Sequence, residues 1–106
     1  MSKVKIIRFV ADSDPFVMEI EPTLEQMQSL VGGLIDIVSI RPDGLMLCCN
    51  DEGKILDLPW TVTIWDGHDY IAGDCFLFRS DADGETISVT QADIDEFVGH
   101  GRIEDL

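Results

Sequence analysis

Three acidic residues alternate along one predicted turn, where their carboxylates could bind a cation. Asp81, Asp83 and Glu85 surround Gly84, and carboxylates at alternate positions near a glycine are typical of calcium-binding loops. The EF-hand loop also needs a third oxygen ligand before its glycine and a glutamate at its twelfth position, which here is Ala92. The spacing therefore favours an acidic hairpin turn over a calcium site.

His68 is a candidate for metal or acid–base chemistry. It adjoins Asp69, and a neighbouring carboxylate can orient an imidazole for either role. The other histidine, His100, is distant in sequence, and the chain has no Cys-x-x-Cys or His-x-x-x-His spacing, which zinc sites commonly use. We therefore predict a solvated turn histidine and no metal.

Three cysteines lie in strand-like apolar runs, at Cys48, Cys49 and Cys75. Cys48 and Cys49 are adjacent and should point to opposite faces of a strand. A cysteine nucleophile needs a nearby base and a lowered pKa, whereas burial is expected here, so we interpret all three as reduced core residues. The chain also has no nucleophile elbow, phosphate loop or dinucleotide fingerprint. The sequence predicts no enzyme and no cofactor.

Two tryptophans and one polar turn could hold a small ligand. Trp60 follows Pro59 and Trp65 ends a predicted strand, and an indole in such a position can stack on a ring. The turn that starts at Asn50 could offer backbone N–H groups, and Lys54 could neutralise an anion. The same residues are also explained by structural roles, since tryptophans are often buried in a core and the polar residues from Asn50 form a turn. A nucleotide-like ligand is therefore an alternative prediction, not the leading one.

The chain carries 21 acidic and 7 basic side chains, a formal net charge of −14. This charge excludes a general binder of nucleic-acid phosphates, which needs a basic face. Residues 1–56 have a net charge of −4 and residues 57–106 one of −10, so the second half could steer a basic partner. Its candidate partner-binding residues are Asp66, Asp69, Asp74, Asp81, Asp83 and Glu85. Solubility alone is the alternative explanation of the charge.

Turn residues and apolar runs predict two short helices among several strands. Thr23 and Gln26 have capping-box spacing before an apolar helical face, and Gly32-Gly33 supplies the stop. Thr90 and Asp93 predict a second capped helix. The predicted strands cover residues 4–10, 16–21, 34–40, 45–49, 54–58, 62–65, 69–72, 75–79 and 86–89.

This order of elements predicts an α+β domain with a mainly antiparallel sheet and two short helices packed on it. A small half-open barrel is the close alternative. Residues 1–99 form the predicted single compact domain, and residues 100–106 a polar tail that frays. The longest apolar runs, such as residues 45–49, are far shorter than the ~20 residues of a membrane span. We expect a protein of the reducing cytoplasm.

Several motifs, taken in order, resemble those of a known family. They are Leu30-Val31-Gly32-Gly33, Gly44-Leu45, Asn50-x-Glu52-Gly53-Lys54, Leu58-Pro59, Asp69-x-Ile71-x-Gly73, and Thr90 with Asp93-Ile94. Over residues 16–98 the chain resembles a small family labelled only as a domain of unknown function, found in phages, prophages and conjugative elements. That family commonly has Asn two positions after the Leu-Pro pair, where this chain has Thr61. The resemblance implies an accessory protein of a mobile element and no catalytic residue.

These features together predict a non-enzymatic phage or mobile-element protein that binds and inhibits a host factor. The expected partner is a basic nucleic-acid-binding or defence protein in the host cytoplasm, held by an acidic surface that imitates nucleic acid. One alternative is a protein that sequesters a nucleotide-like small molecule. Another is a structural or regulatory accessory protein, charged for solubility, that forms a homodimer through a strand edge. We expect no direct contact with nucleic acid or membrane.

Overall fold

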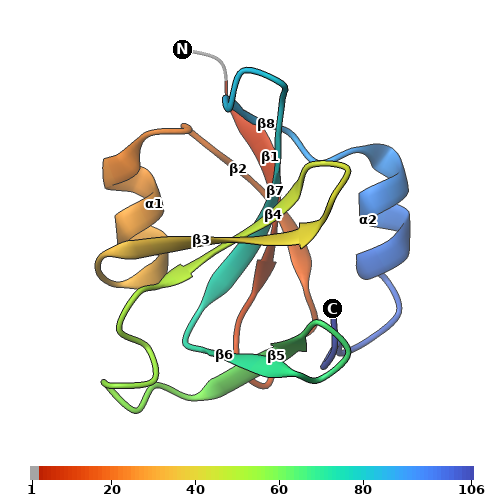
Figure 1. Ribbon diagram of the computed structural model, residues 1–106. Helices are drawn as coiled ribbons and strands as arrows, with labels where there is room; N and C mark the ends of the chain where they lie inside the picture. Colours follow the sequence, from red (N-terminus) through yellow and green to blue (C-terminus); the bar gives the residue numbers. More distant parts are fainter. Residues whose placement is uncertain (1–2) are drawn as a thin grey trace.

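The computed structural model describes residues 3–106 and places two helices and eight strands among them (Figure 1). In chain order they are β1 (Val4–Phe9), β2 (Phe16–Ile20), α1 (Leu24–Val31), β3 (Ile35–Arg41), β4 (Leu45–Asn50), β5 (Trp60–Ile64), β6 (Asp69–Ala72), β7 (Cys75–Ser80), β8 (Thr86–Ile87) and α2 (Gln91–Phe97). None of the helices in this part of the chain has the length and apolar character needed to cross a membrane.

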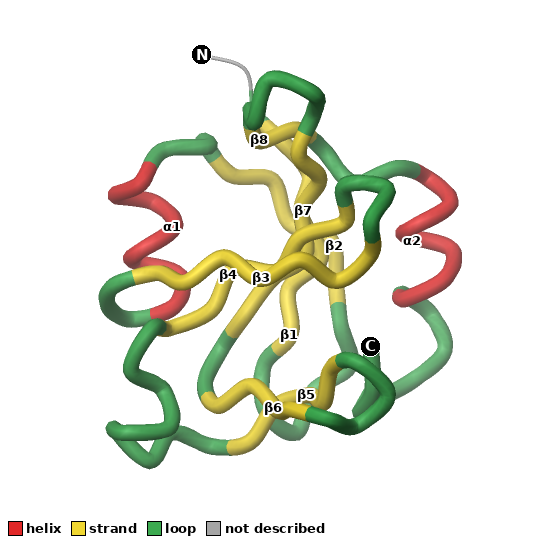
Figure 2. Tube along the Cα trace, in the orientation of Figure 1, coloured by secondary structure: helices red, strands yellow, loops and turns green. Residues whose placement is uncertain are grey.

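Six strands form one antiparallel sheet in the order β2-β1-β7-β4-β3, with β8 paired to the end of β7. β5 and β6 form a separate two-stranded ribbon below this sheet in the view of Figure 2. The predicted α+β class, with a mainly antiparallel sheet and two short helices, is confirmed. The sheet does not close into a barrel, because β2 and β3 remain as its two edges.

Both helices begin at the caps that the sequence predicts. The Thr23 side chain accepts a hydrogen bond from the backbone N–H of Gln26, and α1 ends where Gly32 adopts a left-handed φ of 79°. At α2, Thr90 and Asp93 form a complete capping box. Local chemistry therefore sets both helix starts.

The central strands are buried on both faces because each face has its own cover. Neighbouring residues alternate between two apolar clusters, as Cys48 and Cys49 do on β4. α1 covers one face, where Met27 and Leu30 pack. α2 and the β5–β6 ribbon cover the other face, and Figure 1 shows the two helices on opposite sides of the sheet. The prediction for the cysteines is confirmed: all three are buried and free.

The predicted strand at residues 54–58 is wrong. β4 pairs with β7 on its far side, and residues 51–57 form successive turns instead. The backbone N–H of Leu56 donates to the Glu52 carbonyl at 2.9 Å, and Asp57 adopts a left-handed φ of 55°. We call residues 51–59 the crossing loop, because they carry the chain from the main sheet to the ribbon.

The C-terminal residues lie against the ribbon. The N–H of Thr63 donates to the Glu104 carbonyl, and the N–H of Leu106 donates to the Thr63 carbonyl, each at 2.9 Å. Ile103 and Leu106 also pack against the core. The tail is polar in composition, yet its two apolar side chains and these hydrogen bonds place it beside β5.

Candidate functional site

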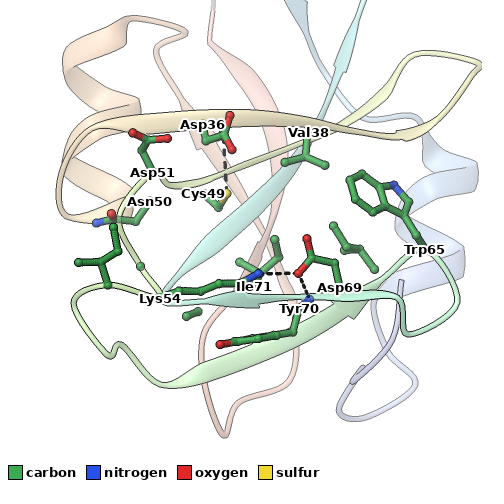
Figure 3. Close-up of a pocket in the computed structure, with 14 residues that line it drawn as sticks. Asp36, Val38, Cys49, Asn50, Asp51, Lys54, Trp65, Asp69, Tyr70 and Ile71 are labelled. Carbon is green, nitrogen blue, oxygen red and sulfur yellow. Dashed lines mark hydrogen bonds and ion pairs between the residues drawn. The ribbon is translucent and has the colours of Figure 1, made fainter.

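A cavity of about 360 Å³ lies between the β3–β4 hairpin, the crossing loop and the ribbon (Figure 3). Its floor is apolar, with side chains from both sheets: Val38, Cys49, Ile64, Ile71 and Ala72. The rim is polar and aromatic, and its side chains come from four segments: Asp36, Asp51, Lys54, Trp65, Asp69 and Tyr70. Pockets that bind ligands have this make-up, in which apolar walls give area and a few polar groups fix orientation.

The thiol of Cys49, on the cavity floor, is unreactive. Burial raises the pKa of Cys49 to about 11, and its Sγ donates to the Asp36 carbonyl at 3.7 Å. Burial likewise raises the pKa of Cys48 to about 12 and that of Cys75 well above its usual value. A thiol with such a pKa stays protonated at neutral pH and is a poor nucleophile.

The rim holds three carboxylates, from Asp36, Asp51 and Asp69, and Lys54 is the one cationic side chain among the residues that line the cavity. Lys54 Nζ lies 2.5 Å from Asp69 Oδ1 and 4.4 Å from the centre of the Tyr70 ring. The hydrogen bond from Lys54 lowers the pKa of Asp69, and the same bond raises the pKa of Lys54. The site already accommodates an ammonium group, from the protein itself.

Trp65 closes one end of the cavity in an unusual backbone conformation (Figure 3). Its φ is 55°, in the left-handed region, followed by Asp66 at 56° and Gly67 at 81°. A bulky residue rarely adopts this region. The indole Nε1 donates to the Ser39 carbonyl at 3.0 Å, which fixes the ring against β3 while 46% of the side chain stays exposed. These residues form the tight β5–β6 turn, in which the His68 N–H donates to the Trp65 carbonyl at 3.1 Å.

The structure brings three of the four predicted ligand residues to this cavity, namely Asn50, Lys54 and Trp65. Asn50 has a structural task there, because its Nδ2 donates to the Val31 carbonyl and its Oδ1 accepts from the Glu52 N–H. Trp60 lines a neighbouring hollow that also contains Tyr70. The Trp60 side chain therefore does not join the other three.

The six predicted partner-binding acids do not lie in one group. Asp81, Asp83 and Glu85 belong to the β7–β8 turn, at the end of the molecule far from the ribbon in Figure 1. Asp81 is engaged within this turn, where its Oδ1 accepts from the N–H groups of Asp83 and Glu85. Within residues 3–106 no group of three or more His, Cys, Asp or Glu could hold a metal ion.

The remaining three acids lie at or near the ribbon. Asp66 is in the β5–β6 turn, Asp69 is paired with Lys54, and Asp74 lies 3.3 Å from the Arg8 guanidinium. Only Asp69 of the six lines the cavity.

Sequence reasoning missed Asp36, Asp51 and Tyr70. Tyr70 lies inside the Asp69-x-Ile71 motif, and Asp51 inside the Asn50-to-Lys54 motif, so both were one position from residues already singled out. No motif in the neighbouring sequence indicated that Asp36 would belong to a site. It reaches the rim because β3 pairs with β4 in a register that sets Asp36 opposite Cys49.

Comparison with known protein families identifies a family for this chain. The model of a family described as a domain of unknown function, DUF3846, matches residues 4–101. The chain belongs to the DUF3846 family. No curated protein and no solved structure was found to match it. The DUF3846 match includes every segment of this chain that lines the cavity.

Proposed function

We propose that this protein is a non-catalytic binding protein for a basic host protein, and that the cavity is where the partner is anchored. The observation that carries the proposal is the rim itself, which has three carboxylates, one lysine and two exposed aromatic rings. Aromatic side chains beside a pocket are typical anchors in protein interfaces. Carboxylates around them select a positively charged partner.

The same charges disfavour the nucleotide-like ligand. A phosphate would enter a cavity with three carboxylates and one lysine, and that lysine is already paired with Asp69. The net charge of −14 adds long-range repulsion. A basic partner is attracted instead, because the net negative charge of the protein acts on it at long range and the carboxylates of the rim can form ion pairs with it.

Within this proposal the scattered acids have a kinetic role. The β7–β8 turn and the ribbon carry acids at separate ends of the molecule, so they raise the encounter rate without forming one continuous imitation of nucleic acid. The mobile-element setting, in which the captured protein is a host defence factor, is part of the proposal. It rests on the resemblance described above.

The test compares two double variants with the same change in charge. Asp36→Asn/Asp51→Asn alters the cavity rim, whereas Asp83→Asn/Glu85→Gln alters the β7–β8 turn. Each immobilised protein is incubated with host lysate at low and at moderate salt, and retained proteins are identified by mass spectrometry. We expect one basic protein that wild type and the turn variant retain at moderate salt and the rim variant loses.

Two results would contradict the proposal. If no basic protein is retained by wild type at either salt concentration, binding of a basic partner is wrong. If the two double variants lose the same protein equally, net charge alone causes the attraction, and the cavity does not anchor the partner.

A further inference from the structure

The crossing loop places a lysine where a ligand would otherwise lie. Lys54 comes from the turns after β4, yet its ammonium lies on Asp69 and over the Tyr70 ring, both from β6 (Figure 3). About half of the Lys54 side chain is exposed. An exposed ion pair of this kind contributes little to stability, so another cation can displace the ammonium at small cost.

Two more carboxylates of the rim are free to accept a cation. Among residues 3–106, neither Asp36 nor Asp51 forms an ion pair with a basic side chain. Both are exposed and line the cavity, beside β3 in the view of Figure 3. One lysine therefore leaves most of the acceptor capacity of the rim unused.

The exposed ring of Trp65 favours a guanidinium over an ammonium as the cation that the cavity binds. Its ring is fixed by the hydrogen bond to Ser39 and presents an exposed aromatic surface at the end of the cavity. A guanidinium is planar, stacks on aromatic rings and forms two parallel hydrogen bonds with carboxylates, whereas an ammonium is a compact, strongly hydrated point charge. The rim thus offers what an arginine side chain can use.

We infer that the cavity is an arginine site, and that Lys54 is its resident occupant, which an arginine of the basic partner displaces. This inference rests on the proposed function for the origin of the arginine. In the free protein Lys54 neutralises Asp69. On binding, the guanidinium stacks on Trp65 and takes the place of the ammonium on Asp69.

The test uses Nα-acetyl-arginine amide as the probe and Nα-acetyl-citrulline amide, its neutral isostere, as the matched control. The readout is the indole N–H signal of Trp65 in ¹⁵N NMR spectra, assigned with a Trp60→Phe variant, at constant ionic strength. We expect the arginine compound to shift this signal and the citrulline compound to leave it in place. Equal shifts with both compounds, or no shift with either, would overturn the inference.

Displacement is tested with Lys54→Met, against Lys5→Met as a control with the same change in charge on the exposed side of β1. We expect Lys54→Met to bind the arginine compound about threefold more tightly, because the exposed ion pair that the arginine must displace is removed. Lys5→Met should bind like wild type. If both variants bind alike, Lys54 does not compete. Circular dichroism spectra confirm that each variant is folded.

The two proposals fail in different ways. A basic protein retained from lysate, together with an unshifted Trp65 signal, refutes the arginine site and leaves the basic partner in place. A shifted Trp65 signal and tighter binding by Lys54→Met, with no basic protein retained, establishes the site and refutes the proposed function.

Discussion

Asp93 is the most heavily hydrogen-bonded carboxylate of the described residues. It accepts from the Nε and Nη2 groups of Arg79 at 2.8 and 2.7 Å, and from the backbone N–H of Thr90 at 2.8 Å. The side chain is 4% exposed. The guanidinium of Arg79 lowers the pKa of Asp93 from 3.8 to about 2. Asp93 therefore joins the start of α2 to β7 and neutralises the guanidinium of Arg79.

Acid should weaken the fold through Asp93. Its pKa is lower in the folded state than in the unfolded state, so its contribution is complete above about pH 4 and is lost as the pH falls towards 2. The contribution at neutral pH is about 2 kcal/mol of unfolding free energy. Asp93→Asn should lose this amount at pH 7 and show a flatter dependence between pH 4 and 2, measured by urea unfolding at each pH.

Asp95→Asn is the control for this prediction, since it makes the same change in charge on the same helix. Asp95 is exposed and accepts one hydrogen bond, from Gln91. We expect it to stay close to wild type. Equal losses from the two variants would mean that helix charge, and not the Arg79 pair, is responsible.

At the scale of elements, Gly53 is the residue that lets the crossing loop approach the ribbon. A Cβ at Gly53 would lie 2.2 Å from the backbone oxygen of Ala72, whereas one at Gly33 would lie 3.1 Å from Nδ2 of Asn50. A backbone oxygen on β6 cannot move without shifting the strand. A side-chain amide can yield by a few tenths of an ångström.

Gly53→Ala should therefore destabilise the protein by about 3 kcal/mol, and Gly33→Ala by less than about 1 kcal/mol. Urea unfolding of both variants measures the difference. Gly53→Ala should also disturb the cavity, because Gly53 lines it. If the two variants prove equally stable, the close contact between loop and ribbon does not hold in solution.

The sequence predicted the features that depend on neighbouring residues, and it did not predict those that depend on contacts between distant segments, such as Gly53 with Ala72. The helix caps at Thr23 and Thr90 depend on residues three positions away, so their patterns were sufficient. Residues 54–58 have the composition of a strand, but the position of β6 decides their conformation. Lys54 and Asp69 are 15 residues apart, so their pairing required the fold.

At the scale of the whole molecule, the excess of acidic residues destabilises the folded state, although it also attracts basic partners. A net charge of −14 on 106 residues repels itself in the compact state. Salt screens this repulsion, with a Debye length of about 10 Å at 0.1 M. The melting temperature should therefore rise as sodium chloride is added up to ~0.1 M.

The turn variant Asp83→Asn/Glu85→Gln separates screening from other effects of salt. With two fewer negative charges it should melt at a higher temperature than wild type at low salt, and it should gain less from added salt. Differential scanning fluorimetry measures both. A melting temperature that does not respond to salt in either protein would show that the acids are too well separated to repel one another.

The position of the C-terminus decides how the protein should be attached to a solid support. Leu106 is hydrogen-bonded to Thr63 of the ribbon and lines a hollow together with Trp65, so a linker that follows it starts beside the mouth of the cavity. β1 begins at the other end, where the Lys5 N–H bonds to Ser88. A bead coupled through the C-terminal side would turn the cavity towards its own surface, whereas coupling ahead of β1 leaves the cavity facing the solution.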